Sequence, residues 1–329
     1  MKIPWKTYLG TLLSIGLLVL VGSQLSLKDC IAGFSRITPA WIAPMVGLFA
    51  IGLYLRAKRW QCLLAPAKVI SLADSGNVIL VGNFANNVLP AKAGDMARAV
   101  ILQRRNGVRL LFGLTAVAVE RIFDGLALLL LLVTSDLFIT LAPTYLATMR
   151  HIAYGAGALF LGALAVLLGA KAFPALLRLG GILAGRLPGG LGTKASELVE
   201  SLQESLFFIR PDSAFAAFAL LSLGVWVVEG LTIWVGFQAF SIPGSIMDAY
   251  FTFAVTNFGG LLPSAPGNLG IYQASVVFAF SMLDLPLDTA VPLSIVVQSV
   301  QILFNSALGL YAMRRLQLGF SFFRSTAAR

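Results

Sequence analysis

Three ionisable residues fall within five positions of a long apolar stretch. Glu120, Arg121 and Asp124 interrupt the run Leu110–Val133. Charges at the centre of a membrane helix cost roughly 2.5–3.5 kcal/mol each, so they need partners or water and are candidates for function. On a helix, Glu120 and Asp124 share a face, and Arg121 is close enough to Asp124 to pair with it. The group predicts either an anion-binding arginine held by Asp124 or an ion cluster that stabilises helix packing.

Two more polar residues lie in other apolar runs. Glu229 is the single carboxyl of Ala214–Phe240. Two interpretations stay open: it pairs with a basic residue from the other half of the chain, or it stays protonated and couples transport to protons. Asn305, in the last apolar run, is predicted to hydrogen-bond to a neighbouring helix.

Basic residues follow two of the apolar segments. Arg56, Arg59 and Trp60 end the second long run, a pattern typical of positive-inside anchoring with an interfacial tryptophan. Asp95 and Arg98 lie three residues apart at the start of a predicted helix. Asp95 is expected to favour the N-terminal turn, and Arg98 is expected to reach an anionic headgroup.

Two segments of the chain resemble each other and contain the remaining candidate residues. Val81–Met96 and Val255–Leu269 both read V-x-N-F, then L-P, then Gly with a polar residue after three positions. Paired Gly- and Pro-interrupted segments in two halves mark the binding site of many transporters, because the freed backbone groups must line a cavity. The substrate-binding positions predicted here are Asn83, Asn87, Pro90, Asn257, Pro263, Gly267 and Asn268.

The elements that carry these residues are predicted to be membrane helices. The chain has 329 residues, of which 58% are hydrophobic and 12% charged, whereas soluble domains are about 25% charged. The fold class is therefore an all-α polytopic membrane protein with about six full spans. Two shorter segments, Val69–Pro90 and Met247–Leu283, are predicted to be broken, re-entrant helices forming an inverted repeat. The full spans are Tyr8–Val21, Trp41–Leu55, Leu110–Val133, Ile152–Ala170, Ala214–Phe240 and Ala290–Ala312.

The distribution of positive charge predicts the orientation. With both termini in the cytoplasm, 20 of the 24 Lys and Arg residues face the cytoplasm, three face outward and Arg121 lies within a span. We expect one transmembrane domain over residues 1–329, with pseudo-repeat halves at about 40–170 and 213–315. Residues 193–210 have the spacing of an amphipathic helix and are predicted to form a cytoplasmic linker between the halves.

Several functional classes are excluded or disfavoured. The basic residues, which give a net charge of +10, occur in short clusters between apolar runs, so the charge predicts contact with anionic lipid headgroups and not with nucleic acid. A single histidine, His151, disfavours catalytic triads and multi-histidine metal sites. No metal and no cofactor is expected.

Four motifs in order give the chain a family resemblance. They are R-x2-RW at Arg56, N-x2-LP-x3-GD-x2-R from Asn87, E-R-x2-D at Glu120, and LP-x-x-PG-x-LG from Leu262. The chain resembles the flippase-like membrane proteins named after the transmembrane region of lysylphosphatidylglycerol synthase. This chain has Gln273 where members of that family often carry a glutamate.

The resemblance implies lipid translocation and no synthase activity, so the protein is not expected to be an enzyme. The predicted function is the flipping of an anionic or phosphate-linked lipid across the bacterial inner membrane. The lipid would be a phospholipid, a polyprenyl-phosphate-linked lipid or a hopanoid-type lipid, held by Arg121, Arg98 and helix N-termini. Two alternatives stay open, namely a membrane-embedded transferase acting on a lipid-linked substrate and a non-transporting accessory protein. The oligomeric state is not predicted.

Overall fold

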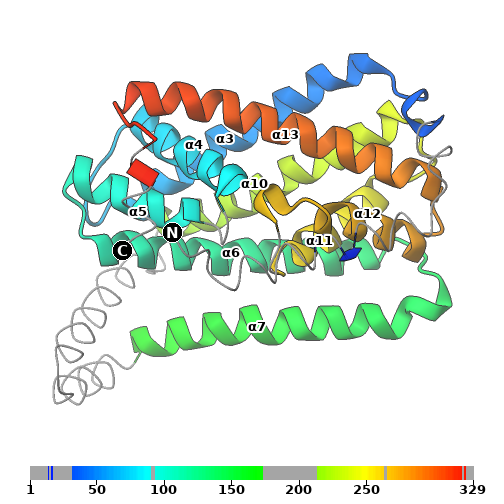
Figure 1. Cartoon of the computed structure of the whole chain (residues 1–329). Helices are drawn as coiled ribbons and strands as arrows, with labels where there is room; N and C mark the ends of the chain where they lie inside the picture. The colour runs from blue at the N-terminus through cyan, green and yellow to red at the C-terminus, as the bar shows by residue number, and fades with distance from the viewer. Residues whose placement is uncertain are drawn as a thin grey trace.

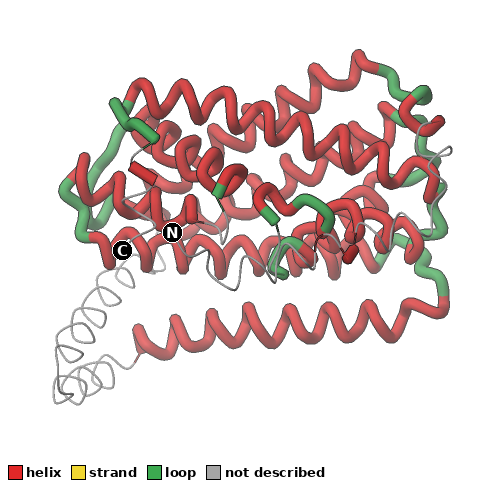
Figure 2. The backbone as a smooth tube through the Cα atoms, in the orientation of Figure 1, coloured by secondary structure: helices red, strands yellow, loops and turns green. Residues whose placement is uncertain are grey.

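The part of the chain described by the structure, a computed structural model, is helical throughout (Figures 1 and 2). It comprises residues 14, 16–17, 32–89, 93–172, 213–262, 265–320 and 322–323. The α-helices are α3 (Ile42–Leu64), α4 (Leu72–Val88), α5 (Ala93–Asn106), α6 (Leu110–Asp136), α7 (Leu146–Ala172), α10 (Ser213–Ala239), α11 (Ile246–Gly259), α12 (Ile271–Met282) and α13 (Leu287–Arg315). The 3-10 turns are η1 (Pro39–Trp41), η2 (Pro143–Tyr145) and η3 (Pro266–Asn268).

Four helices of the described residues are long and apolar enough to cross a bilayer. They are Pro39–Leu64, Pro143–Val166, Ala214–Ala239 and Leu287–Arg315, which correspond to four of the predicted spans. The predicted span Leu110–Val133 forms α6, whose 27 residues include the three central charges. The predicted first span, Tyr8–Val21, lies almost entirely outside the described residues, and the predicted linker helix 193–210 lies wholly outside them. The protein is therefore a helical, membrane-embedded chain.

The two Gly- and Pro-containing segments each become a pair of packed helices. In the first pair α4 packs against α5, and in the second α11 packs against α12. The second pair is broken between the end of α11 at Gly259 and the start of α12 at Ile271, where Gly267 and Gly270 adopt positive φ angles of 69° and 86°. The prediction that Val69–Pro90 is itself broken was wrong, because α4 is continuous from Leu72 to Val88. Helix α4 ends at Val88, and the helix packed against it, α5, begins at Ala93.

Both pairs begin with the same capping arrangement, which the sequence comparison had missed. The Ser71 hydroxyl accepts a hydrogen bond from the Asp74 amide at 3.0 Å. At α11 the Ser245 hydroxyl accepts one from the Asp248 amide at 3.1 Å, and the Asp248 carboxylate accepts one from the Ser245 amide. Serine at the N-cap and an acidic residue at N3 satisfy the free amides of a first helical turn. The internal similarity therefore begins at residues 71 and 245, ten residues before V-x-N-F.

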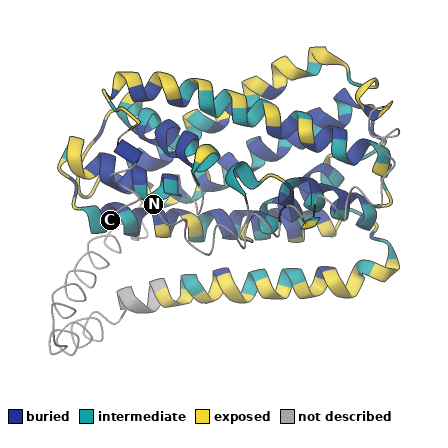
Figure 3. Ribbon diagram, in the orientation of Figure 1, coloured by how far each residue is buried: buried dark blue, intermediate teal, exposed yellow. Residues whose placement is uncertain are grey.

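Helices of the two halves pack on each other reciprocally. The long helices α3 and α10 contact each other directly. Helix α13 packs on α4 of the first pair, and α6 packs on α11 of the second. Within the halves, α5 contacts α6 as α12 contacts α13. In contrast, α7 lies along α6 at the edge of the bundle and is largely exposed (Figures 1 and 3).

Close helix contact in the first pair depends on glycine. A Cβ on Gly94 would collide with the carbonyl oxygen of Gly82 on α4. The Gly94 amide instead donates a hydrogen bond to the Asn86 side chain at 2.8 Å. This contact places the first turn of α5 against the middle of α4, and so determines where Arg98 lies.

The apolar core is divided into two main clusters. One contains Trp60 and Val119, and the other contains Phe49 and Ala127. On α6, the last buried residue of the first cluster is Val119, and the first buried residue of the second is Ala127. The charged residues Glu120, Arg121 and Asp124 lie between them. The polar residues are thus concentrated in a layer near the middle of the bundle.

Candidate functional site

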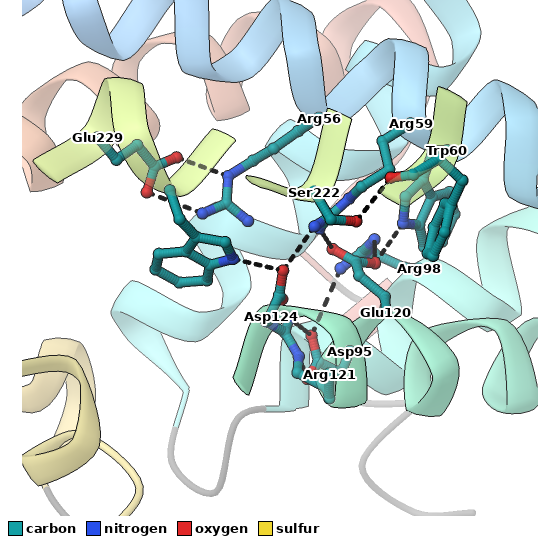
Figure 4. A network of polar contacts seen from close by, with 12 residues as sticks. Arg56, Arg59, Trp60, Asp95, Arg98, Glu120, Arg121, Asp124, Ser222 and Glu229 are labelled. Atoms are coloured by element: carbon teal, nitrogen blue, oxygen red, sulfur yellow. Dashed lines mark hydrogen bonds and ion pairs between the residues drawn. The ribbon is translucent and has the colours of Figure 1, made fainter. Parts of the chain in front are cut away.

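Glu120 is the centre of a buried polar network (Figure 4). Its carboxylate accepts hydrogen bonds from Arg59 on α3 at 2.5 Å and from Arg98 on α5 at 2.5 Å. The indole of Trp60 donates to the same carboxylate. The Arg98 guanidinium lies over the Trp60 ring, 3.8 Å from its centroid. Arg59, Arg98 and Glu120 are at most 3% exposed, so this part of the network is buried.

Asp124, one turn further along α6, joins three helices. Arg59 donates to one carboxylate oxygen at 2.5 Å, and the indole of Trp226 on α10 donates to the same oxygen at 2.8 Å. Arg121 donates to the other oxygen at 3.1 Å. The predicted Arg121–Asp124 pair is therefore confirmed, and Asp124 connects the first half of the chain to α10.

Arg121 forms the open edge of the network. It contacts the Asp95 carboxylate through Nη2 at 2.9 Å and through Nε at 3.3 Å. Its side chain is nevertheless 43% exposed. A guanidinium has five N–H donors, and the three described contacts of Arg121, to Asp95 and Asp124, use one from each nitrogen. Two N–H groups have no partner among the described residues, so Arg121 can still bind an anion.

A second ion pair crosses between the halves. Arg56 on α3 donates to both carboxylate oxygens of Glu229 on α10, at 2.7 and 2.8 Å. The Arg56 guanidinium also lies 5.1 Å from the centroid of the Trp226 ring. Glu229 thus has the partner from the other half that one of the two interpretations expected.

The interpretation of Arg56, Arg59 and Trp60 as interfacial anchors was wrong. Arg59 and Trp60 have no exposed surface, and all three residues bind carboxylates inside the bundle. Arg98 is buried as well, and its described partners are Glu120 and Asp95. The sequence contained a signal for this arrangement, because one intramembrane arginine cannot neutralise the three carboxylates of two spans. Arg56 and Arg59 of the R-x2-RW motif were therefore the candidate partners for these carboxylates.

A cavity lies beside the network and has two adjoining compartments of about 230 Å³ each. We call them the amide compartment, which contains Asn83, Asn87, Arg98 and Glu120, and the aromatic compartment, which contains Asp124 and Asn257. Six residues line both compartments, namely Phe49, Arg121, Glu229, Gly267, Asn268 and Gln301. Because these six residues are shared, the two compartments lie directly next to each other.

The remaining predicted site residues lie as follows. Asp95 is absent from the cavity lining and contacts it through Arg121. Pro90 and Pro263 lie outside the described residues. Asn257 lies near the end of α11, before the second break, and its side-chain amide donates to the carbonyl of Phe253 in the same helix at 2.9 Å. Near the two N-termini that were expected to hold a phosphate, at residues 90–95 and 267–268, one amide each is already bound, since the Gly94 amide donates to Asn86 and the Gly270 amide donates to Gln273 at 2.8 Å.

Contacts between α4 and α13 close the opposite wall of the amide compartment. Asn83 donates to the Asn305 carbonyl at 3.1 Å, which confirms the predicted interhelical role of Asn305. Asn87 donates to the Ser306 hydroxyl at 3.3 Å. Asn86 and Gln301 also line this compartment, although sequence reasoning did not select them. Asn86 lies inside the repeated segment Val81–Met96, whereas no sequence pattern around Gln301 marks it as a cavity residue.

The charges of the network balance. It contains four arginines and four carboxylates, namely Arg56, Arg59, Arg98, Arg121, Asp95, Glu120, Asp124 and Glu229. Within the described part of the chain, no group of three His, Cys, Asp or Glu side chains is arranged to hold a metal ion. The arrangement is suited to binding a polar group through hydrogen bonds and one accessible cation.

Comparison with known proteins identifies the family. The family model described as the lysylphosphatidylglycerol synthase TM region matches residues 8–309. The chain belongs to this family. The resemblance inferred from the four motifs is thereby confirmed, and Arg56, Arg98, Arg121 and Gly267 all lie within the matched range.

The relatives of the chain include one protein named as a glycosyltransferase and several named only as membrane proteins. Glycosyltransferase AglD of Haloferax volcanii is 24% identical over 294 residues, covering 80% of this chain and 47% of that protein. The chain thus spans about half the length of AglD. Two UPF0104 membrane proteins of Methanothermobacter thermautotrophicus are 28% and 22% identical, covering 70% and 93% of this chain and 70% and 92% of their own lengths. No solved structure matches.

Proposed function

We propose that this protein translocates an anionic or phosphate-linked lipid across a bacterial inner membrane. The observation that carries the proposal is a cavity inside a helical membrane bundle. Polar residues from both helix pairs line this cavity. Polar groups at membrane depth are tolerated where they line a water-filled space or a substrate path. A lipid headgroup crossing the bilayer needs such a space, while its tails stay in the hydrocarbon.

Arg121 is the residue proposed to bind the phosphate. Arginine binds phosphate through a planar fork of N–H donors. Asp95 and Asp124 hold the guanidinium in place, and its 43% exposed side chain borders both compartments. The buried Arg59 is paired with Glu120 and Asp124, and Arg98 is paired with Glu120 and Asp95, although the Nε of each has no hydrogen-bond partner in the described part of the chain. In this proposal both serve to position α3, α5 and α6 around the cavity.

The proposed transport path follows the internal similarity. In this proposal the α4–α5 pair enters from the cytoplasm and the α11–α12 pair from outside, which makes the halves an inverted repeat with both termini cytoplasmic. The equal spacing of Ser71 to Asn83 and of Ser245 to Asn257 supports it, as does the reciprocal packing of the two halves. In such folds the substrate site lies at the repeat interface, where Arg56 and Glu229 join α3 to α10.

The test is a translocation assay in proteoliposomes. The protein is reconstituted with phosphatidylglycerol carrying a fluorophore on one acyl chain, and an added phospholipase or headgroup-oxidising reagent measures exposure at the outer leaflet. Wild type is expected to move the lipid, and Arg121→Ala is expected to reduce the rate at least tenfold, because the phosphate loses its cation. The matched control is Arg150→Ala, since Arg150 is exposed on α7.

Two outcomes count against this role. A folded Arg121→Ala protein with wild-type rate would show that Arg121 does not bind the substrate. No movement of any lipid by wild type, in liposomes shown to contain folded protein, would contradict translocation itself. Size-exclusion profiles and thermal unfolding of both variants in detergent establish that the proteins compared are folded.

A second candidate is a membrane-embedded transferase acting on a lipid-linked substrate. It is favoured by one observation, the similarity to a protein named glycosyltransferase AglD over 80% of this chain. In this alternative one carboxylate of the network would have to separate from its arginine partner in order to act as a general base. Incubation of the purified protein with a polyprenyl phosphate and nucleotide sugars, followed by mass spectrometry of the lipids, distinguishes the two, because only a transferase produces a heavier lipid.

A further inference from the structure

The amide compartment is lined by a group of carboxamides. Six of the residues that line it are asparagine or glutamine, and they come from α4, the second break and α13. They are Asn83, Asn86, Asn87, Asn268, Gln301 and Asn305. Carboxamides carry no charge, and each offers two donors and a carbonyl acceptor. So many in one membrane cavity exceed what helix packing requires.

Asn87 donates to the Ser306 hydroxyl and the Ile302 carbonyl, and Asn268 also has a partner, but part of the hydrogen-bonding capacity of the other carboxamides is not used within the described part of the chain. Asn83 and Asn305 share one bond of 3.1 Å between them, and Asn86 accepts one bond from Gly94. Gln301 makes no hydrogen bond to any residue in the part of the chain that the structure describes. Polar groups in a membrane interior are costly unless they are paired. The unused donors and acceptors therefore indicate water or a hydrogen-bonding ligand in this compartment.

The carboxylates of the cavity restrict the charge of that ligand. Glu120, Asp124 and Glu229 line the cavity, and each is paired with arginine at 2.5–2.8 Å. A cationic headgroup such as an aminoacyl ester would need an unpaired carboxylate, and the described lining offers none. Neutral hydroxyl groups need only the donors and acceptors that carboxamides supply.

We propose that the amide compartment is a headgroup subsite for a phosphate-linked lipid that carries several neutral hydroxyl groups, such as a sugar or polyol phosphate. The phosphate lies at Arg121, which borders the compartment, and the hydroxyl groups contact the carboxamides of α4 and α13. The assignment rests on the proposed function, because it assumes that the cavity receives a lipid headgroup. The rings of Phe49 and Phe304, whose centroids lie 6.1 Å apart with 31° between their planes, add an apolar face of the kind that sugar rings pack against.

Native mass spectrometry of the full chain in detergent tests the subsite. Purified protein is offered an equimolar mixture of phosphatidylinositol, phosphatidic acid and lysylphosphatidylglycerol with identical acyl chains. Phosphatidylinositol is expected to be retained at least fivefold over the other two, because only its headgroup is an uncharged polyol on a phosphate. Equal retention of phosphatidic acid, or preference for the cationic lipid, would overturn the proposal.

Variants separate the hydroxyl contacts from the phosphate contact. Gln301→Met removes hydrogen bonding with little change in size, and one lost bond reduces affinity by about 3- to 10-fold. It is expected to lower retention of phosphatidylinositol by that factor and to leave phosphatidic acid unchanged. Arg121→Ala is expected to lower both lipids equally. The control Leu303→Ala alters an exposed residue two positions from Gln301. An unchanged lipid ratio in Gln301→Met would contradict the subsite.

Soluble myo-inositol 1-phosphate distinguishes a lipid-linked ligand from a free one. If it fails to displace phosphatidylinositol at a tenfold excess, the lipid-linked assignment is supported. Displacement at equal concentration would overturn that assignment. The binding ratios and the translocation assay are independent readouts. Lipid movement without headgroup preference would contradict the subsite and leave the proposed translocation intact. Headgroup preference without lipid movement would contradict translocation and leave the subsite intact.

Discussion

Arg56 and Glu229 form a two-pronged ion pair that joins α3 to α10 across the central cavity. Each residue lies in the C-terminal half of the corresponding long helix, and Glu229 borders both compartments. Gly52, one turn before Arg56, gives the Glu229 carboxylate room, since a Cβ there would lie 3.1 Å from Oε1. The pair is thus a direct connection between the two halves.

Loss of either partner is expected to destabilise the protein through the charge left behind. Arg56→Gln and Glu229→Gln should each lower the free energy of unfolding, whereas the double variant should lose less than the sum of the two. The coupling is expected to be about 1–3 kcal/mol, because a paired charge in a poorly hydrated site depends on its partner. Thermal unfolding of the four proteins in one detergent measures it. Strictly additive losses would show that the pair contributes nothing.

The buried Arg59 is expected to be essential for folding. Arg59→Met leaves Glu120 and Asp124 without a cation that contacts both at 2.5 Å. Breaking a buried pair in this way costs about 3–5 kcal/mol, so little folded protein should be recovered. The yield of monodisperse protein after extraction is the measurement. Lys58→Met changes the neighbouring residue to the same side chain and should be recovered normally, since Lys58 has no described ion pair.

Two glycines of α4 should respond oppositely to alanine. A Cβ at Gly82 would lie 2.6 Å from Cγ and Cδ of Arg98, so Gly82→Ala must displace the side chain that binds Glu120. We expect a loss of about 1–3 kcal/mol from overpacking. At Gly76 the nearest atom would be Ala57 Cβ at 3.9 Å. Gly76→Ala should be neutral or stabilise the helix by up to about 1 kcal/mol. Equal melting temperatures for the two variants would contradict this packing.

Cysteine labelling should show that the amide compartment contains water. In a background with Cys30→Ser and Cys62→Ser, Gln301→Cys is expected to react with a charged methanethiosulfonate reagent. Leu303→Cys on the outer face of α13 should not react, although Leu303 is 68% exposed in the isolated chain. The reason is that a thiol must ionise in water to react, and the outer face contacts hydrocarbon. The reverse pattern would place Gln301 away from any aqueous path.

The amino-acid sequence by itself determined the class of the protein and several local features. Its apolar runs predicted long helices because the bilayer sets their length, and five of them appear as helices in the described residues, four of which are apolar enough to cross a bilayer. Gly and Pro located the break between α11 and α12, and a spacing of three residues predicted the Arg121–Asp124 pair. All of these depend on residues adjacent in the chain or one helical turn apart, and such relationships are encoded in local spacing.

Only the tertiary structure decided which distant residues meet. Glu120 is bound by Arg59, 61 positions away, and Arg56 is bound by Glu229, 173 positions away. Helical periodicity tells which face a residue occupies but not which helix that face will contact. Arg59 therefore resembled an interfacial anchor, although it lies in the middle of the bundle. The physical reason is that buried charges must be neutralised, and their partners depend on how α3, α5, α6 and α10 pack.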